Sequence, residues 1–496
     1  MDITAIIDTE ATICAVSTPQ GIGGISVIRV SGREAIANVQ KIWRGKNLMN
    51  CDSHTAHFGE IIDPERREDA PVDECVVTLF RGPGSFTGED TVEISVHGSR
   101  WIQREVIRLL TDNGCRPALA GEFTRRAVMN GRIDLTQAEA VADVIASSSR
   151  AAHRLAASQL KGNFSRRVAS LRDSLLELAS LLELELDFSE EDVEFASRDK
   201  LRALAGQIRD ELGRLHASYS TGAAIKEGIP VAIIGAPNAG KSSLLNLLLS
   251  DDRAIVTDIP GTTRDTVEET LESGDYLFRF IDTAGIRDTS DPIEQLGISR
   301  SIDALRRAHI ILLVIDASSS GDDLSASISS TLAQISPQEN DPESDRDLPY
   351  IIPLLNKSDK SLSSPTLIST VERLIDAYPH SQTIPFSTVT AQGLPTLLEA
   401  LQRAVGASNK DVPNQGTDKG VADTETIMVT NVRHAMLLGE AVEHASKVIT
   451  ALDSGLPTDL VASHLRDTLS TLSTLTGTIT TPDILSNIFE NFCIGK

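Results

Sequence analysis

A glycine-rich segment at residues 235–242 carries the clearest chemical signature in the chain. Its sequence, Gly-Ala-Pro-Asn-Ala-Gly-Lys-Ser, fits the pattern G-x-x-x-x-G-K-[ST] of phosphate-binding loops. Glycines let backbone N–H groups surround phosphates, Lys241 can reach the β- and γ-phosphates, and Ser242 can bind Mg²⁺. An apolar run at 231–234 precedes the loop and a helical pattern at 243–249 follows it, as the motif requires. The segment predicts a nucleotide site.

Three further short motifs complete the predicted nucleotide site, and one of them distinguishes guanine from adenine. Residues 282–285 (Asp-Thr-Ala-Gly) end a strand-like run, where Asp282 can orient Mg²⁺ and the Gly285 N–H can sense the γ-phosphate. Residues 261–265 (Gly-Thr-Thr-Arg-Asp) place Thr263 to complete the Mg²⁺ shell. Residues 356–359 (Asn-Lys-Ser-Asp) end another strand-like run. The aspartate of this last motif can accept hydrogen bonds from N1–H and the 2-amino group of guanine, so the nucleotide is GTP.

The residue after Gly285 is Ile286, where Ras-like enzymes have a glutamine that orients the attacking water. Isoleucine cannot polarise water, so another group must do so. Asp288, Asp291 and Glu294 follow in a predicted loop. Taken alone, any of these carboxylates reads more simply as solvated surface.

The elements around these motifs predict several domains. A chain of 496 residues suggests about three domains. Residues 1–117 combine strand-like runs, among them 25–30 and 92–96, with turns and predict an α+β domain. Residues 118–225 contain no proline and repeat leucine at helical spacing, at Leu171, Leu175, Leu178 and Leu182.

Residues 226–405 alternate helical runs with strand-like runs at 231–234, 278–281, 310–315 and 350–355, which is typical of a parallel sheet wrapped by helices. A polar linker at 406–424 and a second helical stretch at 425–496, with Thr481-Pro482 opening the last helix, complete the chain. The simplest interpretation is an all-α domain interrupted by an inserted α/β domain; an independent C-terminal bundle is the alternative. The Ser-, Asp- and Glu-rich segment 317–349 predicts a flexible loop.

Composition narrows the classes of function. Charged side chains give a net charge of −24, which argues against binding nucleic acid by charge alone. No apolar run is long enough for a membrane span, and the acidic N-terminus lacks the features of a signal or transit peptide. The five scattered cysteines indicate reduced thiols. We therefore expect a cytoplasmic protein with no membrane partner.

Several segments together resemble one family, the tRNA modification GTPases called MnmE or TrmE. They are residues 23–32 (GGISVIRVSG), 86–94 (FTGEDTVEI), 120–127 (AGEFTRRA), 134–140 (DLTQAEA), the GTP motifs, and the closing 492–496 (FCIGK). The resemblance runs essentially end to end. It implies an N-terminal folate-binding α+β domain, a helical domain split by a Ras-like P-loop G domain, and a homodimer through the N-terminal domains.

The resemblance also implies the residues of the nucleotide site. Matching positions for GTP are Asn238, Ala239, Gly240, Lys241, Ser242, Ser243, Thr257, Asp258, Ile259, Pro260, Gly261, Thr262, Thr263, Asp282, Thr283, Ala284, Gly285, Asn356, Lys357, Ser358, Asp359, Ser387, Thr388 and Val389. Among them, Ser242 and Thr263 match Mg²⁺ ligands, and Asn238, Thr257, Ile259 and Thr262 match K⁺ ligands. Without the resemblance, Asn238 reads equally well as a turn residue. Glu294 falls on the family's water-orienting glutamate, and Lys241 is the second catalytic candidate.

For a tetrahydrofolate derivative, the matching residues are Arg29, Glu93, Arg132 and the tail residue Lys496. The implied ligand is the 5,10-methylene form, with the 5-formyl form as a second candidate. On the residues alone, Arg29 and Glu93 read as an ion pair between strands and Lys496 as a frayed end. Cys493, in the family's C-x-G-K tail, is a candidate nucleophile, although a lone cysteine between apolar neighbours is more often a packing residue.

Other features carry less weight. Cys51, His54 and His57 have the spacing of metal ligands, but they show no fourth partner and we do not expect a zinc site. The family's Gly-Arg-Gly-Gly is Gly-Ile-Gly-Gly at 21–24, and its Ser-Ala is Ser387-Thr388, which crowds the base. Segment 317–349 is also longer than expected, so we anticipate altered partner contacts there rather than a lost GTPase.

The leading hypothesis is a K⁺-activated GTPase of tRNA wobble-uridine modification. The resemblance implies a heterotetramer with an MnmG (GidA) family partner that uses FAD and NADH. Together they would install an aminomethyl or carboxymethylaminomethyl group at C5 of uridine 34, with the carbon from folate. The alternatives are a regulatory or ribosome-assembly GTPase without modification activity, and a folate-dependent aminomethyltransferase with a degenerate G domain.

Overall fold

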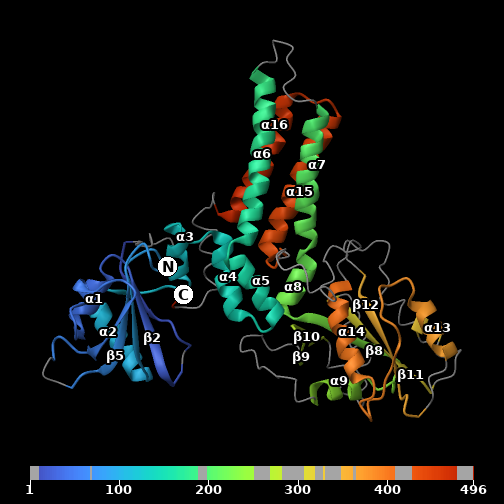
Figure 1. The fold of residues 1–496 in the computed structure, drawn as a ribbon, viewed down its shortest axis with the longest axis horizontal. Helices are drawn as coiled ribbons and strands as arrows, with labels where there is room; N and C mark the ends of the chain where they lie inside the picture. Colours follow the sequence, from blue (N-terminus) through green and yellow to red (C-terminus); the bar gives the residue numbers. More distant parts are fainter. Residues whose placement is uncertain are drawn as a thin grey trace, which may run out of the picture. The chain divides into compact units, whose positions relative to one another are not determined.

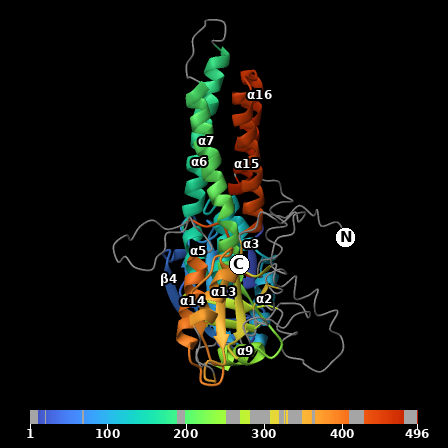
Figure 2. The same cartoon turned by 90° about the vertical axis from the view of Figure 1, so that its right-hand side faces the viewer.

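The protein is described here from a computed structural model (Figures 1 and 2). The described residues are 10–19, 21–66, 70–187, 198–250, 269–281, 307–318, 325, 328–329, 348–360, 365–407, 427–477 and 495. Two compact units comprise the described parts of 1–142, 159–173 and 469–496, and of 143–158 and 174–468.

The N-terminal domain is built on a seven-stranded sheet of order β3-β4-β5-β6-β2-β1-β7. Valine and isoleucine alternate with polar residues along its central strands, so one face is apolar. Helices α1 and α2 contact β6 and help to cover that face, where Ile28, Val92 and Ile94 are fully buried. The elements are β1 (Ile13–Val16), β2 (Gly23–Ser31), α1 (Ala35–Lys41), β3 (Trp43–Arg44), η1 (Leu48–Asn50), β4 (Thr55–Ile61), β5 (Asp73–Phe80), β6 (Thr91–Gly98), α2 (Arg100–Asp112) and β7 (Arg116–Pro117). The predicted strands at 25–30 and 92–96 are confirmed.

Helices follow on from this domain, and the predicted leucine periodicity is real. Leu171, Leu175, Leu178 and Leu182 lie on one buried stripe of α6. The helices are α3 (Glu122–Met129), α4 (Leu135–Ala146), α5 (Arg150–Leu160), α6 (Asn163–Asp187), α7 (Arg198–Ala217), α8 (Tyr219–Glu227), α15 (Val432–Asp453) and α16 (Thr458–Thr476). The predicted helix opening at Thr481-Pro482 lies outside the described residues.

The helices before and after the α/β domain pack together. Helix α15 lies along α7 and also contacts α8, although the whole α/β domain separates them in sequence (Figures 1 and 2). Gly222 of α8 approaches the returning segment so closely that a Cβ would lie 2.1 Å from the Val429 oxygen. This packing favours one interrupted helical domain over an independent C-terminal bundle.

The α/β domain contains a six-stranded sheet of order β13-β12-β11-β8-β10-β9, in which only the β9 pairing is antiparallel among the described strands. Its strands are continuous apolar runs because helices cover both faces. The elements are β8 (Ile229–Gly235), α9 (Lys241–Ser250), β9 (Glu269–Ser273), β10 (Tyr276–Phe280), β11 (Ile310–Asp316), β12 (Tyr350–Asn356), α13 (Pro365–Ile375), β13 (Ile384–Pro385) and α14 (Leu394–Ala407). The predicted parallel sheet is confirmed.

Segment 317–349 departs in part from its prediction as a loop. Most of it lies outside the described residues, but Ser325, Ile328 and Ser329 are helical. Ile328 is only 3% exposed and packs in the core cluster of β11 and α13. An apolar side chain within the Ser-rich run therefore anchors part of it to the domain.

Candidate GTP-binding site

The loop 235–242 joins the end of β8 to the start of α9, so backbone N–H groups at a helix N-terminus face the predicted phosphate position. Asn238 has φ +63° and Gly240 φ +102°. A Cβ on Gly235 would lie 2.1 Å from the Val314 oxygen of β11, and one on Gly240 would lie 2.2 Å from Nδ2 of Asn356. The two glycines of the motif are required because neighbouring atoms leave no room for a side chain.

Lys241 lies over its own loop. Its Nζ donates to the backbone oxygens of Gly235, at 2.9 Å, and Ala236, at 3.0 Å. Half-burial lowers the pKa of Lys241 from its usual value, because a charged amine is poorly solvated there. A nucleotide phosphate would supply stronger acceptors at the same place.

Asn356 joins the phosphate loop to the base-binding loops. Its side chain is 1% exposed, donates from Nδ2 to the Ala239 oxygen at 2.7 Å, and accepts from the Thr388 N–H at 3.2 Å. Three segments far apart in sequence therefore meet at one amide. Asn356 therefore links the phosphate loop to the segment that contains Thr388.

Asp359 is held in place by Ser387. The buried Ser387 Oγ donates to Asp359 Oδ1 at 2.7 Å and accepts from the N–H groups of Val389 and Thr390, each at 3.3 Å. Val389 beside it is 81% exposed. The two predicted base-binding segments are thus brought together, and Ser387 holds one oxygen of the Asp359 carboxylate.

Asp316 is a site residue that the sequence reasoning missed. It ends β11, and its Oδ2 pairs with Lys357 Nζ at 2.6 Å while Oδ1 accepts from Ser318. Partial burial alone raises the pKa of Asp316, but hydrogen bonds from Lys357 and Ser318 outweigh it and lower the pKa. The pair fixes Lys357, whose φ is +64°. Its position at the end of the predicted strand 310–315 was the available signal.

A second candidate site lies on the open face of the N-terminal sheet. Arg29 and Glu93 are opposite each other on β2 and β6, and Arg29 Nε and Nη2 donate to Glu93 Oε1 at 3.0 and 2.7 Å. The guanidinium also stacks over the rings of Phe86 and Phe123, with 5.5 and 5.7 Å to their centroids. The ion pair between strands is therefore real, and both side chains remain about a quarter exposed.

The remaining folate candidates lie on neighbouring segments. Arg132 is exposed and passes Gly88, where a Cβ would lie 3.1 Å from Arg132 Cγ. Gly495, in the chain's C-terminal tail, packs on β1: its oxygen accepts from Ser17 Oγ at 3.0 Å, and a Cβ would lie 2.3 Å from the Val16 oxygen. Strand β1 pairs directly with the strand of Arg29. The segments that carry these candidates are therefore neighbours in the N-terminal domain, and their role toward a folate stays a prediction.

Family models match nearly the whole chain. The model "MnmE helical domain" matches residues 135–493, and the model "GTP-binding protein TrmE N-terminus" matches residues 12–132. The chain belongs to the MnmE family of tRNA modification GTPases. Relatives of that name from Parabacteroides distasonis, Bacteroides thetaiotaomicron and Porphyromonas gingivalis are 44%, 44% and 45% identical to it. Each alignment covers 98% of this chain and 100%, 100% and 98% of the relative.

The predicted family and fold class are confirmed, and the protein is a GTP hydrolase of tRNA modification. Among solved structures, the G domain of the T. maritima FeoB iron transporter has a TM-score of 0.24 and 21% identity, over 36% of this chain and 98% of that one. That similarity adds nothing to the assignment. None of the described helices has both the length and the apolar character of a membrane span.

Several predicted site residues lie outside the described residues. They are Thr257, Asp258, Ile259, Pro260, Gly261, Thr262, Thr263, Asp282, Thr283, Ala284, Gly285, Glu294, Cys493 and Lys496. Their roles stay predictions. Asn238 is described, and its left-handed backbone suits a turn, a conformation that asparagine tolerates.

The weak zinc candidate has ordinary explanations. Cys51 Sγ donates to the Asn47 oxygen, and the rings of His54 and His57 bond to Ser53 and Thr55. Within the described part of the chain, no group of three His, Cys, Asp or Glu residues is placed to hold a metal. The described cysteines, Cys14, Cys51, Cys75 and Cys115, are free and buried.

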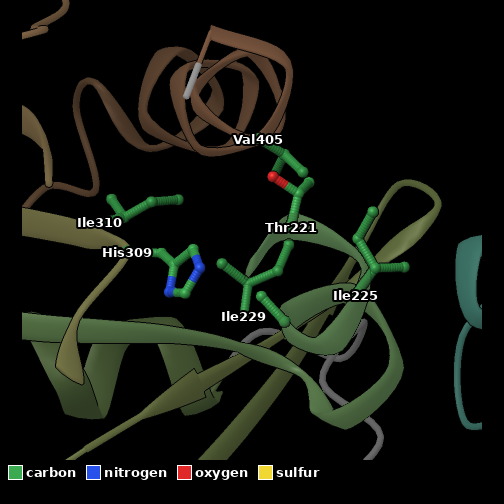
Figure 3. Close-up of a pocket in the computed structure, with 7 residues that line it drawn as sticks. Thr221, Ile225, Ile229, His309, Ile310 and Val405 are labelled. Atoms are coloured by element: carbon green, nitrogen blue, oxygen red, sulfur yellow. The ribbon is translucent and has the colours of Figure 1, made fainter. Parts of the chain in front are cut away.

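A small apolar pocket lies at the opposite end of β8 from the phosphate loop (Figure 3). Ile225, Ile229, Ile310 and Val405 supply aliphatic walls, and His309 lies at one side (Figure 3). The imidazole Nε2 is 3.2 Å from the Ser220 oxygen of α8. The lining is mainly aliphatic and lies at the opposite end of β8 from the phosphate loop, so we interpret the pocket as packing at the α8 junction.

Proposed function

We propose that this protein is a K⁺-activated GTPase that modifies C5 of the wobble uridine of certain tRNAs. It acts with an FAD- and NADH-using partner of the MnmG (GidA) family and takes the carbon from a tetrahydrofolate derivative. The product is an aminomethyl- or carboxymethylaminomethyluridine. One observation carries the proposal: a single chain of this family contains both kinds of site. Its G domain holds Asp359 through Ser387, and its N-terminal domain bears the Arg29–Glu93 pair.

In the G domain, each predicted site residue has a distinct task. Asp359, oriented by Ser387, selects guanine, and Lys241 exchanges its two loop carbonyls for the β- and γ-phosphates. Ser242, with Thr263, binds Mg²⁺, which supplies positive charge against the phosphates. Asn238, Thr257, Ile259 and Thr262 hold K⁺, whose charge serves the role of an arginine finger. Glu294 orients the attacking water.

In the N-terminal domain, Arg29, Arg132 and Lys496 suit the glutamyl carboxylates of a folate, and Glu93 suits the pterin N–H groups. Arg29 is already positioned by its bonds to Glu93 and by two aromatic rings. Docking of Gly495 on β1 brings the end of the chain to the strand beside Arg29, which supports a role for Lys496. Cys493 remains the candidate nucleophile in that tail.

A homodimer through the N-terminal domains is part of the proposal. The sheet face that bears Arg29 also carries exposed apolar side chains, Ile25 and Phe58, each 70% exposed. Burial of such a face against a second copy would be favourable, since apolar surface is removed from water. The partner and tRNA then meet a dimer in a heterotetramer, and GTP hydrolysis drives domain rearrangement rather than the carbon transfer. We expect the complex to work in the cytoplasm.

Nucleoside mass spectrometry of tRNA tests the proposal. A strain lacking its own family member is complemented with this chain or with Glu294→Ala. Restoration of 5-substituted wobble uridine by the wild type and not by the variant supports coupled hydrolysis and modification. Restoration by both shows that hydrolysis is dispensable or that Glu294 has another role. If neither restores it, reconstitution with the chain's native MnmG-family partner decides whether the function or the host pairing failed.

A further inference from the structure

In sequence, the hairpin β9–β10 lies between segment 261–265, predicted to complete the Mg²⁺ shell, and segment 282–285, predicted to orient Mg²⁺ and sense the γ-phosphate. It begins at Glu269, six residues after Thr263, and ends at Phe280, two residues before Asp282. Strand β10 also pairs in parallel with β8, the strand that leads into the phosphate loop. Chain connectivity therefore joins the hairpin to both segments, and the sheet joins it to the strand before the phosphate loop.

The turn of this hairpin is held against the helical domain. The backbone oxygen of Asp275 accepts from the Ala151 N–H of α5 at 2.9 Å. The Asp275 carboxylate pairs with Arg154 at 2.8 Å and with Arg150 at 3.5 Å. One residue of the G domain thus makes main-chain and side-chain contacts with the first turn of a helix in another domain.

The first turn of α5 is built to receive these contacts. Ser149 Oγ accepts from the Ala152 N–H, while the neighbouring Ala151 N–H goes to Asp275. A carboxylate at a helix N-terminus is also favoured by the positive end of the helix dipole. Ala151 and Leu155 pack against the core cluster of the G domain that contains Phe278. The contact therefore combines polar and apolar components.

The turn is also tied into its own domain. Gly274 has φ +64°, and a Cβ there would lie 2.7 Å from Gln402 of α14, whose Nε2 donates to Ser273 Oγ at 3.1 Å. The carboxylate of Asp275 is 34% exposed, and the side chains of Arg150 and Arg154 are 69% and 62% exposed. Exposed ion pairs of this kind are individually weak, so they can form and break during a reaction cycle.

We propose that Asp275 is a positioning residue of the GTPase cycle. Its contacts with the first turn of α5 transmit the nucleotide state of the phosphate loop and its neighbouring segments to the helical domain. Among the described residues, the hydrogen-bond and ion-pair partners of Asp275 lie in the first turn of α5, and it acts through that helix. The proposal predicts that its loss separates GTP hydrolysis from tRNA modification.

A charge-exchange series tests this assignment in the full-length protein. The single variants are Asp275→Lys and Arg154→Glu, the rescue is the double variant, and Asp210→Lys on the exposed surface of α7 is a control with the same charge change. We expect kcat and KM for GTP within about threefold of wild type in all four. Wobble-uridine modification should fall about tenfold in each single variant and recover at least threefold in the double variant.

Hydrogen exchange supplies a readout that does not depend on modification. In wild type, the amides of 150–155 should exchange at different rates in the GDP-bound and GTP-analogue-bound states, and Asp275→Lys should abolish that difference. The hydrogen-exchange measurement is independent of the modification assay, which rests on the proposed wobble-uridine function. If wild type restores no modification, the proposed function fails while hydrogen exchange still tests the contact.

Three results would overturn the assignment. Unchanged modification in Asp275→Lys would show that the contact transmits nothing. A parallel loss of GTPase activity and modification, with no recovery in the double variant, would make Asp275 a residue of stability only. Equal hydrogen-exchange rates of the amides of 150–155 in both nucleotide states of wild type would show that the nucleotide state does not reach α5.

Discussion

Asn356 donates a hydrogen bond of 2.7 Å from Nδ2 to the backbone oxygen of Ala239, a residue 117 positions earlier in the chain. The bond links the end of β12 to the phosphate loop after β8, with β11 between these strands in the sheet. The same amide accepts from the Thr388 N–H. One side chain therefore bonds to both the phosphate loop and a base-binding loop, so its loss should disturb both loops together.

Replacement of Asn356 by alanine should damage both halves of the nucleotide site. It leaves the buried Ala239 carbonyl and the part-buried Thr388 N–H without this partner, at a cost of about 1–3 kcal/mol for the buried group and less for the other. We expect GTP affinity to fall by about tenfold or more, as measured by titration with a fluorescent GTP analogue. Asn246→Ala, at an exposed position of α9, is the matched control and should bind GTP normally. Equal binding by both variants would contradict the bridging role.

Ser387→Ala should reduce the preference for guanine. The variant frees the Asp359 carboxylate from its 2.7 Å bond, which is worth about 1–2 kcal/mol or roughly 5–30-fold in affinity. We expect binding of GTP to weaken more than binding of ITP, which lacks the 2-amino group. Competition titrations measure both, with Ser381→Ala as the control because its hydroxyl bonds to the adjacent Gln382 oxygen. An unchanged GTP-to-ITP ratio would argue against orientation by Ser387.

Gly235→Ala should abolish nucleotide binding through geometry alone. The added methyl group would lie 2.1 Å from the Val314 oxygen, so the loop or β11 must shift. Gly206→Ala on α7 is the opposite case, because a Cβ there meets nothing within 4 Å. That helix substitution should stabilise the protein by about 0.5–1 kcal/mol. Thermal melting and GTP binding of both variants check the pair.

Glu122→Gln should destabilise the N-terminal domain. The Glu122 carboxylate is fully buried, accepts from Arg116 at 2.6 Å and from the Leu119 N–H at 2.9 Å, and pairs with Arg126. Loss of its charge removes one carboxylate partner from the buried Arg126 and one from Arg116, which is 33% exposed, and should cost about 3 kcal/mol. Trp43 and Trp101 are the chain's two tryptophans, so fluorescence during unfolding reports on this domain.

The same carboxylate should make stability depend on pH. Burial alone raises the pKa of Glu122, but bonds from Arg116 and the Leu119 N–H outweigh burial and lower the pKa below 4.5. The folded state therefore binds this proton less readily than the unfolded state. Its stabilisation is complete above the unfolded pKa and is lost as pH falls from about 4.5 through the folded pKa. Glu122→Gln should flatten this part of the stability profile, and an identical profile would exclude the assignment.

Local sequence determined much of the G domain and its nucleotide. Short apolar runs at 231–234, 310–315 and 350–355 predicted buried parallel strands, because helices that cover both faces of a sheet leave no polar alternation. The loop 235–242 was readable since phosphate binding needs glycines and a lysine at fixed spacing along the chain itself. Motifs spread over the whole chain likewise indicated the family from the sequence alone.

Tertiary structure alone decided which residues hold that site together. Asp316 and Ser387 act on partners 41 and 28 residues away, and no local pattern reports contacts that arise from neighbouring strand ends. Whether Arg29 forms an ion pair with Glu93 also depended on the register of β2 against β6, which places the two residues opposite each other. Packing of α15 on α7, across the entire inserted domain, joined two helical stretches that periodicity could only identify separately. Sequence encodes each element through its own spacing, whereas contacts between distant elements depend on how their buried faces fit.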